Sequence, residues 1–249
     1  MQIVNLLDRG PLDYMDVDRL QRFIHSQVAD QQMPDTFILW ESAAVYTAGR
    51  RTEDQDIPDT AIPVIRMDRG GSVTYHGPGQ LVIYPIIKVR PPKDVVAFVR
   101  STEVAVIDAM RSLGLETRQI DGRSGVWVQD GIQDRKLCAI GIKFADDATL
   151  HGLALNVATD IDAFMKVIPC GLPDVGVVAL NQLGLTASLS GVADALVPRL
   201  AAAYERFARR EGEGLRVTNT DELLDRLSQQ EPAKSLPSMT GGLWRPKGS

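Results

Sequence analysis

The stretch that decides the fold is residues 66–87, which read RMDRGGSVTYHGPGQLVIYPII. Gly70-Gly71 and Gly77-Pro78-Gly79 flank the segment 72–76, and glycine permits positive φ angles and close backbone approach. The apolar run Leu81–Ile87 does not alternate with polar residues, so it predicts a strand that is buried on both faces. A polar loop with glycine hinges and a rigid strand behind it is typical of a functional site, although a glycine-rich hairpin without chemistry would look the same.

Helices are predicted on both sides of this stretch. Upstream, apolar residues recur at spacings of three and four over residues 16–30, which indicates an amphipathic helix. Downstream, Asp94 is a suitable N-cap for a helix that runs to about Ser112. A last long helix is predicted over residues 192–210, and Pro198 within it indicates a kink or a late start.

Short strands follow one another closely after the second helix. Strands that are neighbours in the sequence favour antiparallel or mixed pairing over strict strand–helix alternation. The sequence therefore predicts an α/β fold of the α+β type, a mixed or antiparallel sheet flanked by helices. The strands are expected at 3–7, 36–41, 81–89, 116–120, 125–129, 136–144 and 151–157, with a brief helix at 162–167.

The composition is that of a globular protein. The 249 residues are 44% hydrophobic and 24% charged, and they contain no internal repeat or linker within 1–210. We therefore expect a single domain over 1–210, followed by a polar tail over 211–249 that is partly disordered apart from a short helix at 221–228. We expect a monomer, because no apolar surface helix is left without a place.

The sequence also indicates the cellular location and the class of partner. The chain has no apolar run of membrane-spanning length, and its N-terminus lacks the pattern of a signal peptide, which favours the cytoplasm. Two cysteines are too few for a disulfide framework, so both should be reduced. A net charge of −5 argues against nucleic acid as the main partner.

Cys170 is the candidate nucleophile. It lies between Pro169 and Gly171 at the end of the brief predicted helix, where free backbone N–H groups can stabilise an oxyanion. Cys138 differs, because it lies in a nearly unbroken apolar strand and is expected to be a core residue.

A nucleophilic cysteine needs a neighbouring cation or base that favours the thiolate. His76, His151 and Lys136 are the candidates, and their spacing in the sequence does not choose among them. A lysine partner would suit acyl transfer to an amine, because its ammonium would hold the thiolate and its neutral form would accept a proton from the amine.

Metal and nucleotide sites are not indicated. The three histidines and two cysteines lack the paired spacing of metal ligands. The phosphate-binding pattern Gly-x-x-x-x-Gly-Lys-Ser/Thr and the dinucleotide pattern Gly-x-Gly-x-x-Gly are both absent. We therefore expect no metal and no cofactor.

Three segments, taken in order, resemble the octanoyltransferases, also called lipoyl(octanoyl) transferases or lipoate biosynthesis protein B. The first is residues 69–80, RGGSVTYHGPGQ, and the second is residues 136–143, KLCAIGIK. The third is HGLALNV at 151–157, followed by Pro169-Cys170-Gly171. The resemblance covers about residues 3–210 and leaves the tail without a counterpart.

The resemblance implies a fold shared with biotin and lipoate protein ligases, and a specific reaction. An octanoyl group would pass from octanoyl-acyl carrier protein to a lysine ε-amine of a lipoyl domain, in a 2-oxoacid dehydrogenase complex or the glycine cleavage H protein. Cys170 would form the acyl-thioester, and Lys136 would activate it and serve as acid and base. The substrate pocket would map onto Arg69, Gly70, Gly71, Ser72, Val73, Thr74, Tyr75, His76, Ala139, Ile140, Gly141, Gly152, Leu153 and Ala154.

Three alternatives remain open. A lipoate–protein ligase on the same fold would use ATP and an acyl-adenylate, an amidotransferase would move octanoyl between lipoyl domains, and a non-catalytic protein would only bind acylated carriers. Acyl carrier proteins are acidic, so an acidic enzyme needs a local basic patch. The candidates for that patch are Arg50, Arg51, Arg66, Arg69, Lys88 and Arg90.

Overall fold

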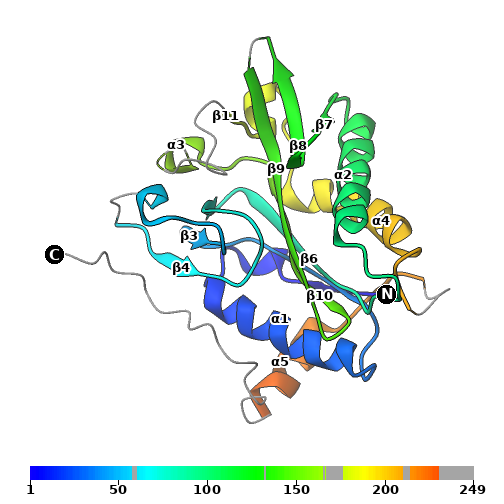
Figure 1. The fold of residues 1–249 in the computed structure, drawn as a ribbon. Helices are drawn as coiled ribbons and strands as arrows, with labels where there is room; N and C mark the ends of the chain where they lie inside the picture. The colour runs from blue at the N-terminus through cyan, green and yellow to red at the C-terminus, as the bar shows by residue number, and fades with distance from the viewer. Residues whose placement is uncertain (58–60, 132, 165, 167–175, 210–213, 230–249) are drawn as a thin grey trace.

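The computed structural model describes residues 1–57, 61–131, 133–164, 166, 176–209 and 214–229 (Figure 1). The strands of the larger sheet are β1 (Gln2–Asn5), β2 (Thr36–Trp40), β6 (Gln80–Ile86), β7 (Arg118–Ile120), β8 (Arg123–Asp130), β9 (Gln133–Ala145), β10 (Ala148–Asn156), β11 (Gly176–Val177) and β12 (Arg216–Val217). A smaller sheet contains β3 (Val45–Ala48), β4 (Val64–Arg66) and β5 (Thr74–His76). The helices are α1 (Tyr14–Ala29), α2 (Val95–Ser112), α3 (Ile161–Phe164), α4 (Leu189–Tyr204) and α5 (Thr220–Gln229).

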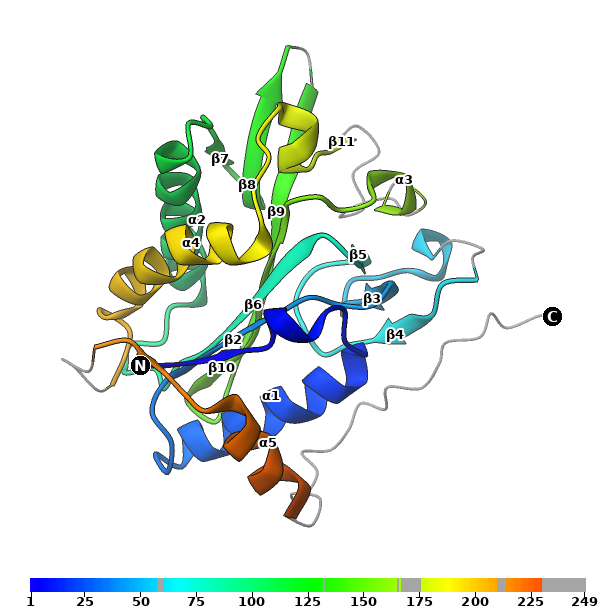
Figure 2. The same cartoon turned by 180° about the vertical axis from the view of Figure 1, so that it is seen from behind.

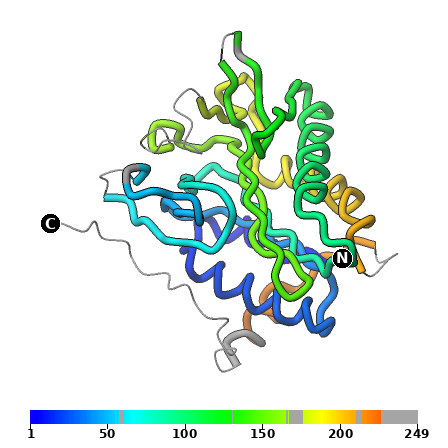
Figure 3. The backbone as a smooth tube through the Cα atoms, viewed as in Figure 1, coloured from blue at the N-terminus to red at the C-terminus, as the bar shows by residue number. Residues whose placement is uncertain are grey.

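The larger sheet is mixed, as predicted. Its strand order is β12-β1-β2-β6-β10-β9-β8-β7, and β11 pairs with β9 at the side of this path. The pairs β12–β1, β1–β2 and β11–β9 are parallel, and the others are antiparallel. The long β9–β10 hairpin runs through the length of the molecule (Figure 3). The predicted fold class, a mixed sheet flanked by helices, is confirmed.

The sheet is covered on both faces. On one face α2 and α4 pack against alternate residues of the strands, such as Leu81 and Ile83 of β6. On the other face α1 packs against the residues between them, such as Val82 and Tyr84 (Figures 1 and 2). All residues of β6 are buried, which explains why that strand has no polar alternation.

Helix boundaries follow from capping and burial. The side chain of Asp13 accepts hydrogen bonds from the backbone of Met15 and Asp16, so α1 begins at Tyr14, two residues earlier than predicted. Asp94 caps α2 as predicted. Pro198 lies inside α4, so the prediction of a late start is wrong. Its ring is exposed, while the opposite face of α4 stays buried in the core.

The smaller sheet was not predicted, because its strands are only three or four residues long. In it β3 pairs with β4 in parallel and with β5 in antiparallel orientation. The sheet holds residues 64–76 beside the β9–β10 hairpin, which places the glycine-rich stretch on the face that carries α1 (Figure 1).

Part of the segment assigned to the polar tail packs on the domain. Strand β12 pairs with β1, and the predicted short helix is present as α5, whose Leu223 is buried against the α1 side of the core. Arg9 and Asp221 form an ion pair between the two ends of the described chain. Among the described helices, none is long and apolar enough to cross a membrane. Residues 230–249 lie outside the described part.

Candidate active site

A cavity of about 400 Å³ lies where β9 and β10 meet the glycine-rich segment that leads into β5. Further lining residues are Tyr14 of α1, Tyr84 of β6 and Phe164 of α3, together with residues 121–124, which are the turn after β7 and the first two residues of β8. The structure thus brings together three segments that are far apart in the sequence. The predicted residues that line the cavity are Arg69, Gly70, Gly71, Ser72, Val73, Thr74, His76, Lys136, Ala139, Ile140, Gly141, Gly152, Leu153 and Ala154.

Tyr75 is a predicted pocket residue that the structure places elsewhere. Successive side chains of a strand point to opposite faces, so Tyr75 of β5 points away from the side taken by Thr74 and His76. Its ring packs between Tyr46 and Phe164, at centroid distances of 5.4 and 6.0 Å. The Tyr75 side chain therefore does not line this cavity, and its role in substrate binding stays a prediction.

Cys170 lies outside the described residues, together with Pro169 and Gly171. Of the described residues near the two ends of this segment, Phe164 lines the cavity, and Val177 of β11 pairs with Lys136 of β9, which also lines it.

Arg69 fastens the glycine-rich segment to the smaller sheet. Its guanidinium donates to the backbone oxygen of Thr47 at 2.5 Å, and to the backbone oxygens of Gly70 and Ser72 at 2.9 Å. The segment also packs tightly, since a Cβ at Gly49 would lie 2.4 Å from the carbonyl oxygen of Gly71. The cavity wall is thus held in shape by a buried arginine and by two glycines in contact.

Asp68 is the centre of a polar network below the cavity. Its carboxylate accepts hydrogen bonds from His151 at 2.8 Å, Lys143 at 2.7 Å and Arg22 at 3.1 Å. The hydrogen bond from His151, and then those from Lys143 and Arg22, hold the pKa of Asp68 well below its usual range. Asp68 therefore ties α1, β9 and β10 to the glycine-rich segment.

The network also sets the proton positions of His151. The Gln21 side chain accepts from the His151 backbone N–H at 2.8 Å, so its amide nitrogen is the group that faces Nδ1 at 3.3 Å. Nδ1 then accepts, and Nε2–H donates to Asp68. Burial lowers the pKa of His151 in spite of this carboxylate, so the ring is neutral and both of its nitrogens are engaged.

His76 is also neutral. Its Nδ1 lies 2.8 Å from the side-chain oxygen of Gln80, whose amide nitrogen donates to the Tyr75 carbonyl and to Asn156. Nδ1 is therefore the protonated nitrogen. Burial, and then the charge of Arg69, lower the pKa of His76 to about 3. A group with this pKa is a poor proton acceptor near neutral pH, so His76 is unsuited to act as the base, and in His151 both ring nitrogens are already engaged.

Lys136 occupies the cavity wall opposite Trp127 of β8. Its side chain is buried, and Nζ lies 4.5 Å from the centroid of the Trp127 ring. Cys138, two residues further along β9, is fully buried, and burial raises the pKa of its thiol. The prediction that Cys138 is a core residue is confirmed.

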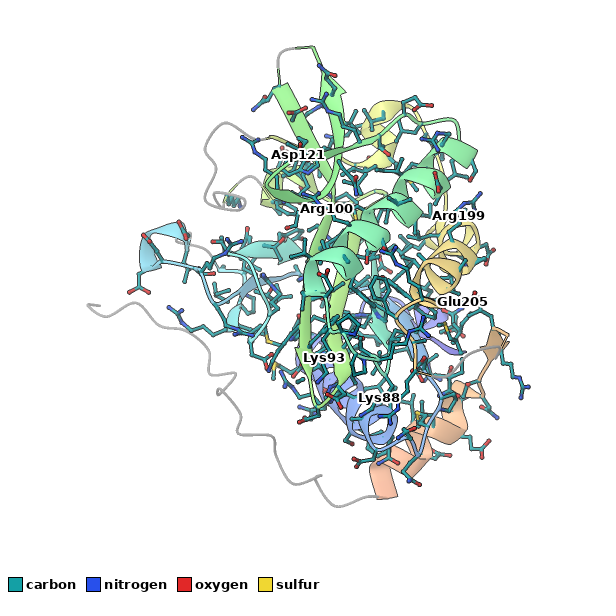
Figure 4. All side chains as sticks on the ribbon, turned by 45° about the vertical axis from the view of Figure 1, so that its right-hand side comes forward. Lys88, Lys93, Arg100, Asp121, Arg199 and Glu205 are labelled. Carbon is teal, nitrogen blue, oxygen red and sulfur yellow. The ribbon has the colours of Figure 1, made fainter. Side chains whose placement is uncertain are left out.

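The basic-patch candidates divide by exposure. Arg69 and Lys88 are buried, so the prediction that they belong to an exposed patch is wrong. Lys88 donates to the carbonyl oxygen of Ala29 at the end of α1 and to that of Asp146. Figure 4 shows where Lys88 lies in the fold. Arg51 is exposed and lines the cavity, as does the partly exposed Arg123, which the sequence did not single out.

Other lining residues were missed for a common reason. Tyr14, Tyr84, Trp127 and Phe164 lie in apolar patterns that indicate core, and nothing in their spacing distinguishes a cavity wall from a packed interior. Residues 121–124, at the start of β8, could not be recognised from the sequence, because their place beside β9 depends on the order of strands in the sheet.

Comparison with known proteins agrees with this geometry. Residues 13–201 match the family described as the lipoyl protein ligase A/B catalytic domain. An octanoyltransferase of Leifsonia xyli subsp. xyli is 45% identical over 205 residues, 81% of this chain and 92% of that protein. An octanoyltransferase of Mycolicibacterium smegmatis is 48% identical over 200 residues, 78% of this chain and 84% of that protein.

A solved structure shares the fold. The bipartite lipoate protein ligase of Thermoplasma acidophilum superposes with a TM-score of 0.63 at 17% identity, and the match covers 92% of each chain. This likeness confirms the predicted relation of the fold to that of lipoate ligases. The family match and the octanoyltransferase relatives show that the chain belongs to the octanoyltransferases of the lipoyl protein ligase A/B catalytic domain family.

Proposed function

We propose that this chain transfers an octanoyl group from the phosphopantetheine thioester of acyl carrier protein to a lysine ε-amine of a lipoyl domain, through a thioester on Cys170. The observation that carries the proposal is the buried Lys136 in the wall of the cavity, in a member of the octanoyltransferases. An ammonium in this place suits a cysteine nucleophile that must act as a thiolate.

The acyl-enzyme forms in the first half-reaction. The Cys170 thiolate attacks the thioester carbonyl, and the bond from this carbon to the phosphopantetheine sulfur breaks. The leaving sulfur takes a proton from the Lys136 ammonium and departs as a thiol. The products are octanoyl-Cys170, the free carrier thiol and a neutral Lys136.

The second half-reaction restores the enzyme. The neutral lysine amine of the lipoyl domain attacks the octanoyl carbonyl, and the bond to Cys170 sulfur breaks. Lys136 accepts the proton that the amine nitrogen loses, and Cys170 leaves as the thiolate. One side chain thus serves as acid in the first step and as base in the second.

The cavity suits the substrate in shape and chemistry. Val73, Ile140 and Leu153 offer apolar surface to an acyl chain, and each buried methylene contributes about 0.8 kcal/mol. The glycines of residues 69–79 leave room for a thioester arm beside the backbone. Arg51 and Arg123 at the cavity would attract an acidic carrier protein.

The acceptors we propose are lipoyl domains of 2-oxoacid dehydrogenase complexes or of the glycine cleavage H protein. The reaction needs a free thiol at Cys170, which a reducing compartment such as the cytoplasm maintains. The monomeric state and the single catalytic domain over 1–210 stay predictions of the same kind.

The test is intact-protein mass spectrometry after mixing the protein with octanoyl-acyl carrier protein, without acceptor or ATP. We expect one added octanoyl group that is absent in Cys170→Ala. The same protein loaded in this way should then pass the group to a lipoyl domain.

Three other outcomes would each favour an alternative. An acyl-adenylate formed from ATP and free octanoate would favour a ligase. An adduct that forms only with an octanoylated lipoyl domain as donor would favour an amidotransferase. Tight binding of the carrier without any adduct, unchanged in Cys170→Ala, would favour a non-catalytic binding protein.

A further inference from the structure

The indole ring of Trp127 lies against the end of the Lys136 side chain. The two residues are cross-strand partners of β8 and β9, and Lys136 Nζ lies 4.5 Å from the ring centroid. Trp127 is 1% exposed and Lys136 is 5% exposed, and both line the cavity. An ammonium this close to an aromatic face, with little water around it, is attracted by the ring quadrupole.

The backbone of β8 is shaped so that this pair can form. The register of β8 against β9 shifts between Val126 and Trp127, so that Val126 pairs with Cys138 and Trp127 with Lys136. A bulge of this kind re-aims the side chain that follows it. Beside the bulge, Gly125 has a φ of +113°, and a Cβ there would lie 2.5 Å from the Cys138 carbonyl oxygen.

Gly125 also packs against the lysine itself. A Cβ at Gly125 would lie 3.3 Å from the Cε atom of Lys136, so glycine leaves the space that the lysine stem occupies. The stem is therefore bounded by the backbone of β8, and the ammonium by the Trp127 ring. Gly125 and Trp127 of one strand thus bound the stem and the ammonium of the same side chain.

A buried carboxylate holds this part of β8 from the other face of the sheet. Glu103 of α2 is fully buried, and its side chain accepts the Gly125 backbone N–H at 2.8 Å. Its second oxygen accepts from Arg100, which Figure 4 shows on α2, and from Gln119 of β7. Helix α2 is therefore bonded directly to the backbone that positions the Trp127–Lys136 pair.

We propose that Trp127 is a positioning residue for acyl transfer, because its indole face holds the Lys136 ammonium at the cavity wall where it can serve Cys170. The inference rests on the proposed function, since it gives Lys136 a role in the reaction. The competing explanation is that Trp127 only fills space in the wall. The two explanations differ in whether the effect of replacing Trp127 on the reaction rate depends on the charge of Lys136.

The experiment compares the rate of octanoyl-Cys170 formation in a double-mutant cycle. We expect Trp127→Leu to lower the maximal rate about 3- to 30-fold with little change in the donor concentration at half-maximal rate. Trp127→Phe, which keeps an aromatic face, should recover most of the loss. In the Lys136→Ala background, Trp127→Leu should have no further effect, because the group on which the ring acts is gone.

Phe98→Leu is the matched control. Phe98 is fully buried on the other face of the sheet, where it stacks on Tyr204 at 4.3 Å, so its loss affects stability without touching the lysine. The rate with Phe98→Leu should equal that of the unchanged protein at a temperature where both are folded. The rate of alkylation by iodoacetamide gives a second readout, which reports the reactivity of Cys170. The other cysteine, Cys138, does not interfere, because it is buried and its thiol pKa is raised.

A second measurement decides the matter if Trp127→Leu fails to fold. Tryptophan with one, two or more fluorine atoms, placed at position 127, weakens the ring quadrupole with little change in shape. The rate should fall with each added fluorine. Equal rates across this series, or an equal loss from Trp127→Leu with and without Lys136, would overturn the proposal. If the unchanged protein forms no adduct on Cys170, the proposed function itself fails, which is a separate outcome.

Discussion

Replacing Asp68 with asparagine tests the polar network beneath the cavity. The change keeps the shape of the side chain but removes the charge that accepts from His151, Lys143 and Arg22. Removing one partner of a fully buried ion pair lowers the free energy of unfolding by about 3 to 5 kcal/mol. Here the Lys143 and Arg22 side chains are 25% and 31% exposed, and Arg22 keeps its ion pair with Asp18. We therefore expect a loss of about 2 kcal/mol.

The loss should depend on pH in a defined direction. The pKa of Asp68 is lowered in the folded state, so its stabilising contribution is complete above the pKa in the unfolded chain, about 3.9. That contribution shrinks as the pH falls below this value toward the folded-state pKa. The difference between the unchanged protein and Asp68→Asn should therefore be full from pH 7 to about 5, and should narrow below about pH 4.

Urea unfolding followed by tryptophan fluorescence measures these differences. The control is Asp108→Asn, which removes a carboxylate paired with Arg111 at 2.7 Å on the exposed side of α2. Both of those side chains are about half exposed, so we expect less than about 0.5 kcal/mol. Equal losses for the two variants, or a difference that does not narrow in acid, would refute the view that Asp68 ties the wall together by its charge.

Three further perturbations have defined outcomes. Lys136→Ala should slow both formation of the acyl-enzyme and its transfer to the amine, because the same group is the proposed acid and base; rapid-quench assays measure each, and an unchanged half-reaction would remove Lys136 from that step. Gly152→Ala should lower the thermal midpoint by about 5 to 10 °C, since a Cβ there would lie 2.0 Å from a carbonyl oxygen of β6. The control is Gly191→Ala, whose Cβ would meet only a serine side chain, and its thermal midpoint should stay within about 2 °C of that of the unchanged protein. Because burial lowers the pKa of His76 and His151, the unfolded chain takes up protons below about pH 6.5 that the folded chain does not. Urea unfolding between pH 7 and 5 should show stability falling as the pH falls, with His76 alone contributing a slope that approaches about 1.4 kcal/mol per pH unit below about pH 6 and His151 adding to it. A flat profile would contradict the burial of these histidines in neutral form.

Periodicity and capping identified most of the larger sheet and its helices, because each long element carries its own apolar pattern. Strand β6 and helix α2 were predicted to within a few residues for this reason. The smaller sheet could not be predicted, since strands of three or four residues are too short to show an alternation of apolar and polar residues. Helix α4 was misjudged at Pro198 because the sequence does not reveal that this residue faces solvent.

The residues of the site were likewise predicted only in part. Glycines and polar residues in unusual places marked residues 69–76 and the hairpin positions beside them, and these do meet at one cavity. The aromatic lining could not be predicted, because Tyr84 and Trp127 have the spacing of ordinary core residues. The pairing of Trp127 with Lys136 depends on a one-residue register shift between two strands, which is set by tertiary packing.

The pairing of β1 with β12 has a consequence for how the chain is made. The pairing joins residues that are more than two hundred positions apart in the sequence, such as Gln2 and Arg216. During synthesis the first strand therefore leaves the ribosome long before its outer partner exists. Until β12 arrives, the free edge of β1 is open to any extended segment, including the same strand of a second copy. Pairing with β12 therefore covers the edge of β1 only late in synthesis, and ending the chain before Arg216 should increase aggregation of the protein.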